Sequence, residues 1–196
     1  MNLPNKLTIL RIILAFAFIF LILSAGLAAK VAAFLVFLLA SITDALDGFL
    51  AKRNNQITDF GKLMDPVADK ILVLSAFLVF VEMGIIPAWM VIVIVFREVA
   101  ITGIRMLALT KGRVIPADGS GRHKTVWQMF SIYVILIFLI LREGGRAAFG
   151  FWGGRPELIY SNVIYVIMLI TVAFTLASGV SFLMKNREVI TNAKKG

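Results

Sequence analysis

Six long apolar segments dominate this chain and restrict what it can fold into. They cover about residues 7–28, 31–51, 63–83, 88–110, 124–142 and 157–184, and each reaches or approaches the roughly 20 residues that a helix needs to cross a bilayer. The chain of 196 residues is 60% hydrophobic and only 16% charged, with a mean hydropathy of +0.95, which is far more apolar than an ordinary soluble domain. Lipid offers the backbone no hydrogen-bond partner, so each segment is predicted to be helical. We therefore predict an all-α, polytopic membrane protein with six transmembrane helices, built as a single domain over residues 1–196.

The distribution of basic residues predicts the orientation of these spans. An even number of spans puts both termini on one side, and most of the lysines and arginines outside the spans lie on that side. The opposite loops hold Lys30, Arg142, Arg146 and Arg155. Because cytoplasmic loops accumulate Lys and Arg, both termini are predicted to face the cytoplasm. The same rule accounts for the net charge of +9, which therefore does not indicate nucleic-acid binding.

Four aspartates stand where two neighbouring spans approach the cytoplasmic side. Asp44 and Asp47 come near the end of the second span, and Asp65 and Asp69 come near the start of the third. At about 1.5 Å per residue, Asp44 lies roughly 10 Å from the cytoplasmic end of its span. The spacings i,i+3 and i,i+4 put each pair on one helix face. Ionisable residues inside a span are costly and usually functional, so we expect a polar, cytoplasm-facing cavity lined by these carboxylates.

The chemistry of this aspartate group favours a divalent cation. Four unpaired carboxylates repel one another, and ligation by oxygen alone favours Mg²⁺, Mn²⁺ or Ca²⁺. The alternative is an ion network in which nearby bases neutralise the acids, the candidates being Lys52, Arg53, Lys62 and Lys70. Lys70 points about 100° away from Asp69 around the helix, which disfavours that alternative. A metal cluster beside lipid suggests a membrane-embedded substrate that carries a pyrophosphate, and a displacement at phosphorus.

The spacing of these residues resembles a known family signature. The pattern Asp44-x-x-Asp47-Gly48-x-x-Ala51-Lys52, eight residues, Gly61-x-x-x-Asp65-x-x-x-Asp69 is similar to that of the CDP-alcohol phosphatidyltransferases, with Lys52 where the family has Arg. The stretches NLPNKLTILR, REVAITGIR and GRHKT resemble the bacterial branch of the family that makes phosphatidylglycerophosphate. In the last of these stretches, Arg122 stands where that branch usually has Lys.

The resemblance implies an activity and a set of site residues. It implies transfer of the phosphatidyl group of CDP-diacylglycerol to glycerol 3-phosphate with release of CMP, by a multi-pass homodimer of the bacterial inner (plasma) membrane with a cytoplasmic active site. It implies two divalent ions, Mg²⁺ or Mn²⁺, in each active site. The implied metal ligands are Asp44, Asp47, Asp65 and Asp69, and Asp69 is also the implied general base. The residues implied to bind CDP-diacylglycerol are Asn5, Thr8, Gly48, Lys52 and Thr58.

Basic residues after the third span are candidates for binding a phosphate on the acceptor, namely Arg97, Arg105, Arg113 and Lys124. Glu98 projects about 100° away from Arg97 around the helix, so the expected partner of Arg97 is the aspartate group or a bound phosphate. Glu98 and Arg105 share a helix face, which would orient Arg105 toward the same cavity. Such a basic set beside an acidic metal site suits glycerol 3-phosphate. The alternative is that these are ordinary basic residues of the cytoplasmic side.

Two other functions remain open. The same chemistry could use inositol phosphate, serine or phosphatidylglycerol as the acceptor. Intramembrane carboxylates also mark ion paths, so a divalent-cation transporter is a further possibility. A transporter is disfavoured because the four aspartates gather at one side, and the outer halves of the second and third spans hold no ionisable residue except Glu82 at the very end of the third.

Overall fold

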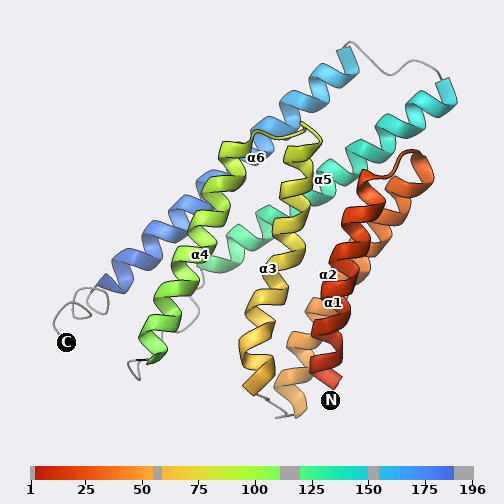
Figure 1. Cartoon of the computed structure of the whole chain (residues 1–196). Coiled ribbons are helices and arrows are strands. Elements are labelled where there is room, and N and C mark those ends of the chain that lie inside the picture. Colours follow the sequence, from red (N-terminus) through yellow and green to blue (C-terminus); the bar gives the residue numbers. More distant parts are fainter. Residues whose placement is uncertain (1–2, 55–58, 111–119, 150–154, 188–196) are drawn as a thin grey trace. The chain divides into compact units, whose positions relative to one another are not determined.

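The computed structural model describes residues 3–54, 59–110, 120–149 and 155–187, and within these ranges the chain is helical, with no strand (Figure 1). Side chains are described throughout these ranges except at 3–8, 44–54, 59–69, 110, 120–123 and 147–149. The helices are α1 (Leu3–Leu23), α2 (Leu27–Asn54), α3 (Asp59–Glu82), α4 (Ala88–Thr110), α5 (Ser120–Phe149) and α6 (Arg155–Lys185). The prediction of an all-α chain with six helices is confirmed.

The helix boundaries differ from the predicted spans by several residues in places, most of all at the ends of the first and fifth helices. The first helix ends at Leu23 instead of near residue 28, because Gly26 adopts a left-handed φ of 93° that ends one helix and lets α2 start at Leu27. Helix α5 covers Ser120–Phe149, whereas its apolar segment covers only 124–142. Hydropathy marks the apolar part of a helix, but the backbone hydrogen bonds continue into the polar residues at either end.

Internal contacts divide the chain into two compact units, and each is described by itself. The first unit contains Met1–Ile85 and Ile132–Tyr160, and the second contains Ile86–Ser131 and Ser161–Gly196. The first therefore holds α1, α2, α3 and the end of α5, while the second holds α4, the start of α5 and most of α6. A single domain over residues 1–196 stays a prediction.

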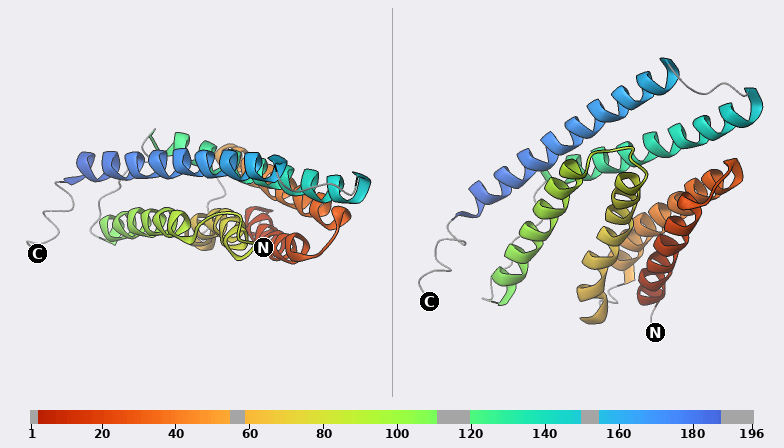
Figure 2. Two further views of the ribbon diagram at one scale, coloured as in Figure 1. Left: turned by 90° about the horizontal axis from the view of Figure 1, so that it is seen from above. Right: turned by 45° about the horizontal axis from the view of Figure 1, so that its top comes forward.

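In the first unit, α1 packs against both α2 and α3, and α2 also contacts α3 (Figures 1 and 2). Aromatic rings fill part of this core. The ring of Phe37 lies 5.3 Å from that of Phe18 and 5.4 Å from that of Tyr133, measured between centroids. Tilted and edge-on pairs at this distance are favourable arrangements for aromatic side chains. The packing brings together α2 and α3, the helices that carry the four aspartates.

A buried lysine closes the turn between α1 and α2. The Lys30 Nζ donates hydrogen bonds to the backbone carbonyl oxygens of Ile22 and Ser24, and Lys30 is only 5% exposed. The last carbonyls of a helix have no partner within it, and a cation at that end also interacts favourably with the helix dipole. Lys30 therefore caps α1 from the first turns of α2.

Helix α3 ends in a glycine turn. The Gly84 N–H donates to the Val81 carbonyl and the Ile85 N–H donates to the Phe80 carbonyl, each at 2.9 Å, and Gly84 has a φ of 68°. This is the Schellman arrangement, in which glycine adopts the left-handed conformation without steric cost. Pro87 then precedes α4.

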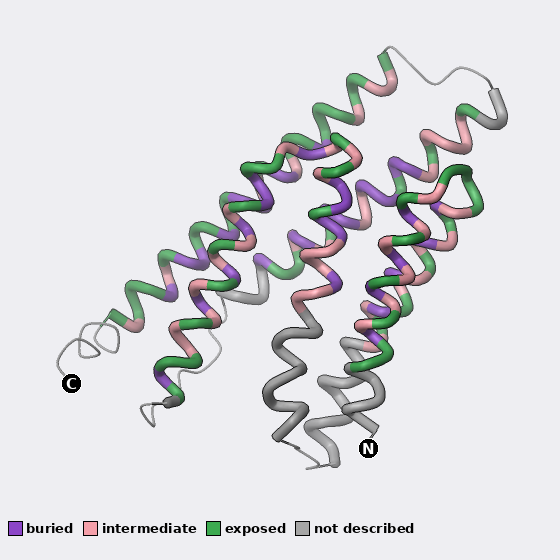
Figure 3. The backbone as a smooth tube through the Cα atoms, in the orientation of Figure 1, coloured by how far each residue is buried: buried purple, intermediate pink, exposed green. Residues whose placement is uncertain are grey.

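The helices of the second unit expose large apolar side chains. On α4, Ile92, Phe96 and Val99 are 64%, 74% and 64% exposed, whereas Met90 and Ile94 on another face are buried. Figure 3 shows exposed and buried positions alternating along the helices. Within the described part of the chain, two helices are long and apolar enough to cross a membrane, Lys124–Arg146 in α5 and Arg155–Lys185, which is α6. Exposed apolar surface of this kind is unusual for a soluble monomer and indicates a membrane protein. The crossing of all six helices stays a prediction.

Candidate functional site

The four aspartates lie on two consecutive helices that contact each other. Asp44 and Asp47 belong to α2, and Asp65 and Asp69 belong to α3. Helix α2 continues without interruption to Asn54, and α3 begins at Asp59. Each pair is therefore about one helical turn apart, as the spacing predicted. Their carboxylates lie outside the described side chains.

The donor set at this position fits a hard divalent cation. Among the side chains that the structure describes, no group of three or more His, Asp or Glu residues could hold a metal ion. The four aspartates lie outside these side chains and stay the predicted ligands, and they offer only carboxylate oxygens. Such oxygens are the ligands that Mg²⁺ and Mn²⁺ prefer.

The residues predicted to bind CDP-diacylglycerol come from the same group of helices. Asn5 and Thr8 belong to α1, which contacts both aspartate-bearing helices, and Gly48 and Lys52 belong to α2. Their side chains lie outside the described ones, and Thr58 lies outside the described residues altogether. Their role in donor binding stays a prediction.

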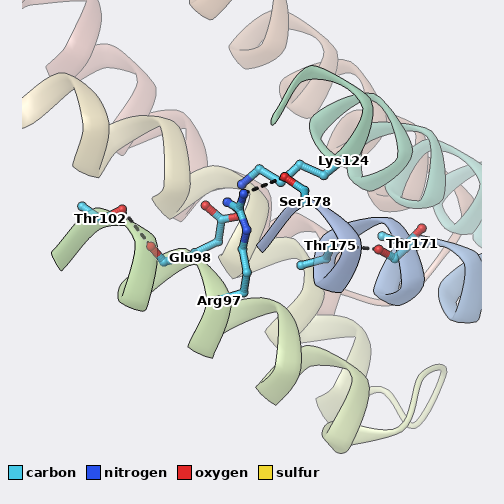
Figure 4. Close-up of polar contacts among 7 residues, drawn as sticks. All are labelled: Arg97, Glu98, Thr102, Lys124, Thr171, Thr175 and Ser178. Atoms are coloured by element: carbon cyan, nitrogen blue, oxygen red, sulfur yellow. Dashed lines mark hydrogen bonds and ion pairs between the residues drawn. The ribbon is translucent and has the colours of Figure 1, made fainter. Parts of the chain in front are cut away.

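Two of the predicted acceptor residues, Arg97 and Lys124, meet at a buried carboxylate (Figure 4). The Arg97 Nη1 lies 3.2 Å from the Glu98 Oε1, and the Lys124 Nζ forms an ion pair with the same oxygen. The three side chains are 9–10% exposed. We call Arg97, Glu98, Lys124 and Ser178 the Glu98 cluster. It joins α4, the start of α5 and α6.

Arg97 pairs with Glu98, although the sequence favoured the aspartate group or a bound phosphate as its partner. The angle of 100° between consecutive residues describes their Cα–Cβ directions, whereas an arginine side chain is long enough to bend around the helix. Both side chains converge near Lys124, and Arg97 thus finds a partner on its own helix.

Helix α6 supplies a second contact for Arg97. The Arg97 Nη2 donates a hydrogen bond of 2.8 Å to the Ser178 Oγ. The next residue is Gly179, where a built Cβ would meet the Arg97 Cγ at 3.2 Å. A side chain there would crowd the arginine stem, so the glycine makes room for it.

The remaining predicted acceptor residues are placed differently. The Arg105 guanidinium lies over the ring of Phe182 on α6, 5.3 Å from its centroid, a distance at which a cation is attracted to an aromatic face. Thr102, which lies between Glu98 and Arg105 on α4, donates a hydrogen bond of 2.7 Å from its hydroxyl to the backbone carbonyl of Glu98, one turn earlier in the same helix. Arg113 lies outside the described residues.

Sequence reasoning missed the contribution of α6. Thr171, Thr175 and Ser178 are spaced i,i+4 and i+7 and are all buried, at 0%, 0% and 4% exposure. The Thr171 hydroxyl also lies 2.6 Å from the hydroxyl of Ser131 on α5. A row of small hydroxyl residues on one face of an apolar helix is typical of close packing between membrane helices, and this row was the available signal.

The Glu98 cluster is electrostatically suited to an anion. Arg97 and Lys124 contribute two positive charges and Glu98 contributes one negative charge, which leaves a net charge of about +1 in a nearly buried place. Guanidinium and ammonium groups form strong charge-assisted hydrogen bonds with phosphate oxygens. The arrangement therefore suits a ligand that carries a phosphate.

Comparison with known proteins agrees with the aspartate pattern. The family model for CDP-alcohol phosphatidyltransferase matches residues 1–177. The CDP-diacylglycerol–glycerol-3-phosphate 3-phosphatidyltransferase of Bacillus subtilis (strain 168) is 33% identical, over 96% of this chain and 97% of its own length. Proteins of the same name are 36% identical in Rickettsia typhi, over 92% of this chain and 94% of theirs, and 31% identical in Mycoplasma pneumoniae, over 90% and 84%. The family generally depends on divalent metal ions. Because the family model covers nearly the whole chain, including all four aspartates, the chain belongs to the CDP-alcohol phosphatidyltransferase family.

Proposed function

We propose that this chain transfers the phosphatidyl group of CDP-diacylglycerol to glycerol 3-phosphate, giving phosphatidylglycerophosphate and CMP. The observation that carries the proposal is the complete aspartate pattern on α2 and α3, two consecutive helices in contact. The names of relatives that align along most of the chain support the choice of acceptor.

The aspartates divide between metal binding and proton transfer. Asp44, Asp47, Asp65 and Asp69 hold two divalent ions, Mg²⁺ or Mn²⁺. When bound, the ions neutralise the pyrophosphate of the donor and stabilise the charge that develops on it. Asp69 accepts the proton of the acceptor hydroxyl while the hydroxyl oxygen forms the new bond to the β-phosphorus of the donor. The bond between that phosphorus and CMP breaks, and the protonated Asp69 then releases its proton to solvent.

Residues of α1 and α2, together with Thr58, hold the donor. Asn5, Thr8, Gly48, Lys52 and Thr58 contact the cytidine diphosphate portion of CDP-diacylglycerol. Lys52 places a point charge against a phosphate oxygen where other family members carry a guanidinium. The acyl chains of the donor remain in the surrounding lipid.

Basic side chains hold the phosphate of the acceptor. Arg97, Arg105, Arg113 and Lys124 belong to this set, and the convergence of Arg97 and Lys124 in the Glu98 cluster supports it. The phosphate of glycerol 3-phosphate supplies a negative charge that both cations can bind, which an uncharged alcohol lacks. This electrostatic argument favours a phosphorylated acceptor.

The membrane arrangement is part of the proposal. All six helices cross the inner (plasma) membrane, both termini and the cytoplasm-facing polar cavity lie on the cytoplasmic side, and two copies form a homodimer. The excess of Lys and Arg in the loops on the side of the termini supports this orientation.

A reconstituted assay tests the function. Purified protein is given CDP-diacylglycerol and, separately, glycerol 3-phosphate, inositol phosphate, serine or phosphatidylglycerol, and both CMP release and the lipid product are measured. We expect product only with glycerol 3-phosphate and only with Mg²⁺ or Mn²⁺ present. Product with another acceptor would reassign the substrate. Metal flux into liposomes without CMP release would instead favour a divalent-cation transporter.

A further inference from the structure

We infer that Glu98 is a positioning residue for the acceptor phosphate, acting through Lys124. This inference rests on the proposed function. Glu98 sets the affinity for glycerol 3-phosphate without touching that substrate. The observation behind it is that one carboxylate oxygen, the Glu98 Oε1, binds cations from two helices.

Glu98 is buried between apolar positions on its face of α4. Its exposure is 7%, and the neighbouring positions on that face, Ile94 and Ile101, are 0% and 5% exposed. A carboxylate in such a place is costly unless it is paired and hydrogen-bonded. Its pairing with Arg97 and Lys124 meets that requirement, which explains how an acid is tolerated here.

The buried ion pair with this carboxylate helps to fix the position of Lys124. A lysine ammonium ends a flexible four-carbon stem, so its location is set by the groups that it binds. Arg97 is held a second time by the Ser178 Oγ and is packed against Gly179. Loss of Glu98 would remove this ion pair from Lys124, while Arg97 keeps its contact with α6.

Charge excludes a direct contact between Glu98 and the phosphate. A phosphate monoester carries close to two negative charges near neutral pH, and the ionised Glu98 has no proton to donate to it. The residue thus has two opposing effects. It repels the phosphate, and it holds in place the ammonium group that attracts it. The inference is that the second effect is the larger one.

A double-mutant cycle separates these two effects. The KM for glycerol 3-phosphate and the KM for CDP-diacylglycerol are measured for the full-length wild type, Glu98→Ala, Lys124→Ala and the double variant. We expect Glu98→Ala to raise the KM for glycerol 3-phosphate about tenfold, with kcat and the KM for CDP-diacylglycerol within about twofold. In the Lys124→Ala background, the ion pair between Glu98 and Lys124 is already gone, so Glu98→Ala should raise that KM much less or lower it.

Two further variants serve as controls: a conservative substitution of Glu98 and a substitution of another acid. Glu98→Gln keeps an oxygen acceptor in the same place. It should therefore raise the KM for glycerol 3-phosphate less than Glu98→Ala does. If the Glu98→Ala protein does not fold, Glu98→Gln takes its place in the cycle. Glu143→Gln is the matched control, because Glu143 is an acid of the other unit that pairs with Arg146 at 3.7 Å. We expect it to leave both KM values unchanged.

The outcomes distinguish this inference from the proposed function. A wild type that releases no CMP with glycerol 3-phosphate overturns both. An active wild type in which Glu98→Ala lowers the KM for glycerol 3-phosphate shows that Glu98 only competes with the phosphate, and this overturns the positioning role alone. A fall in melting temperature with unchanged KM values, or equal effects in both Lys124 backgrounds, overturns it as well.

Discussion

The stem of Arg97 occupies the space that a side chain at Gly179 would need. A Cβ at residue 179 would lie 3.2 Å from the Arg97 Cγ, closer than ordinary carbon contacts. Arg97 cannot easily move away, because its guanidinium is bound to Glu98 at one nitrogen and to Ser178 at another. Arg97 on α4 can therefore take this position because residue 179 on α6 is a glycine.

We expect Gly179→Ala to weaken the binding of glycerol 3-phosphate and to lower the melting temperature. The added methyl group pushes the arginine stem, and overpacking of this kind typically costs about 1–3 kcal/mol. The KM for glycerol 3-phosphate should rise about three- to tenfold, with little change for CDP-diacylglycerol. Steady-state kinetics and thermal unfolding of the purified protein measure both effects.

Gly103→Ala is the matched control for that substitution. Gly103 lies within α4, and a Cβ there would meet no atom within 4 Å. Both substitutions gain the better helix propensity of alanine, which is worth up to about 1 kcal/mol, but only Gly179→Ala crowds Arg97. Equal behaviour of the two variants would contradict the steric account.

We expect Asp69→Asn to abolish turnover while leaving most of the binding of metal and CDP-diacylglycerol in place. An amide cannot accept the proton of the attacking hydroxyl, whereas its oxygen still coordinates a metal ion. CMP release and the binding of labelled CDP-diacylglycerol provide the two measurements. Asp59→Asn, in the same helix but outside the family pattern, should retain activity. Near wild-type CMP release from Asp69→Asn would remove its assignment as the general base.

We expect Lys52→Arg to preserve the activity or to raise it. The substitution restores the residue that the family pattern has at this position, and a guanidinium offers paired donors to a phosphate. The measurement is kcat/KM for CDP-diacylglycerol. A large loss of activity in a protein with an unchanged melting temperature would show that the site has adapted to lysine.

We expect Arg105→Ala and Lys124→Ala each to raise the KM for glycerol 3-phosphate by about ten- to a hundredfold. A hydrogen bond to a charged group contributes roughly 1.5–3 kcal/mol, and 1.4 kcal/mol corresponds to a factor of ten. The KM for CDP-diacylglycerol should change far less. Arg146→Ala provides the control, since this arginine is 49% exposed and pairs with Glu143. Equal weakening of both substrates would mean that Arg105 and Lys124 do not form the acceptor site.

The helices could be predicted from the sequence because hydropathy and helix formation coincide along most of the chain. The predicted span 88–110 has the same bounds as α4. The prediction was less accurate where the two properties separate, as at Glu143 and Arg146, which are charged but still helical in α5. The aspartate helices could be predicted as well, because spacing along a helix is a local property.

The Glu98 cluster could be predicted only in part. Its basic members were identified from their type and their place in the chain. The contact between Arg97 and Ser178 joins residues 81 positions apart, and nothing local in the sequence indicates that α4 and α6 meet there. The direction of a long side chain is likewise decided by its tertiary partners, so the ion pair between Arg97 and Glu98 was not expected from the sequence.

The lysine cap at the turn between α1 and α2 has a consequence for the order of assembly during synthesis. The carbonyls that Lys30 binds belong to Ile22 and Ser24, only eight and six residues earlier in the chain. Contacts of such short range close quickly and need no segment that is synthesised later. The first hairpin can therefore form as soon as α2 emerges from the ribosome and can enter the bilayer as a preformed pair. Helix α3, which brings Asp65 and Asp69, then joins a partner surface that already exists.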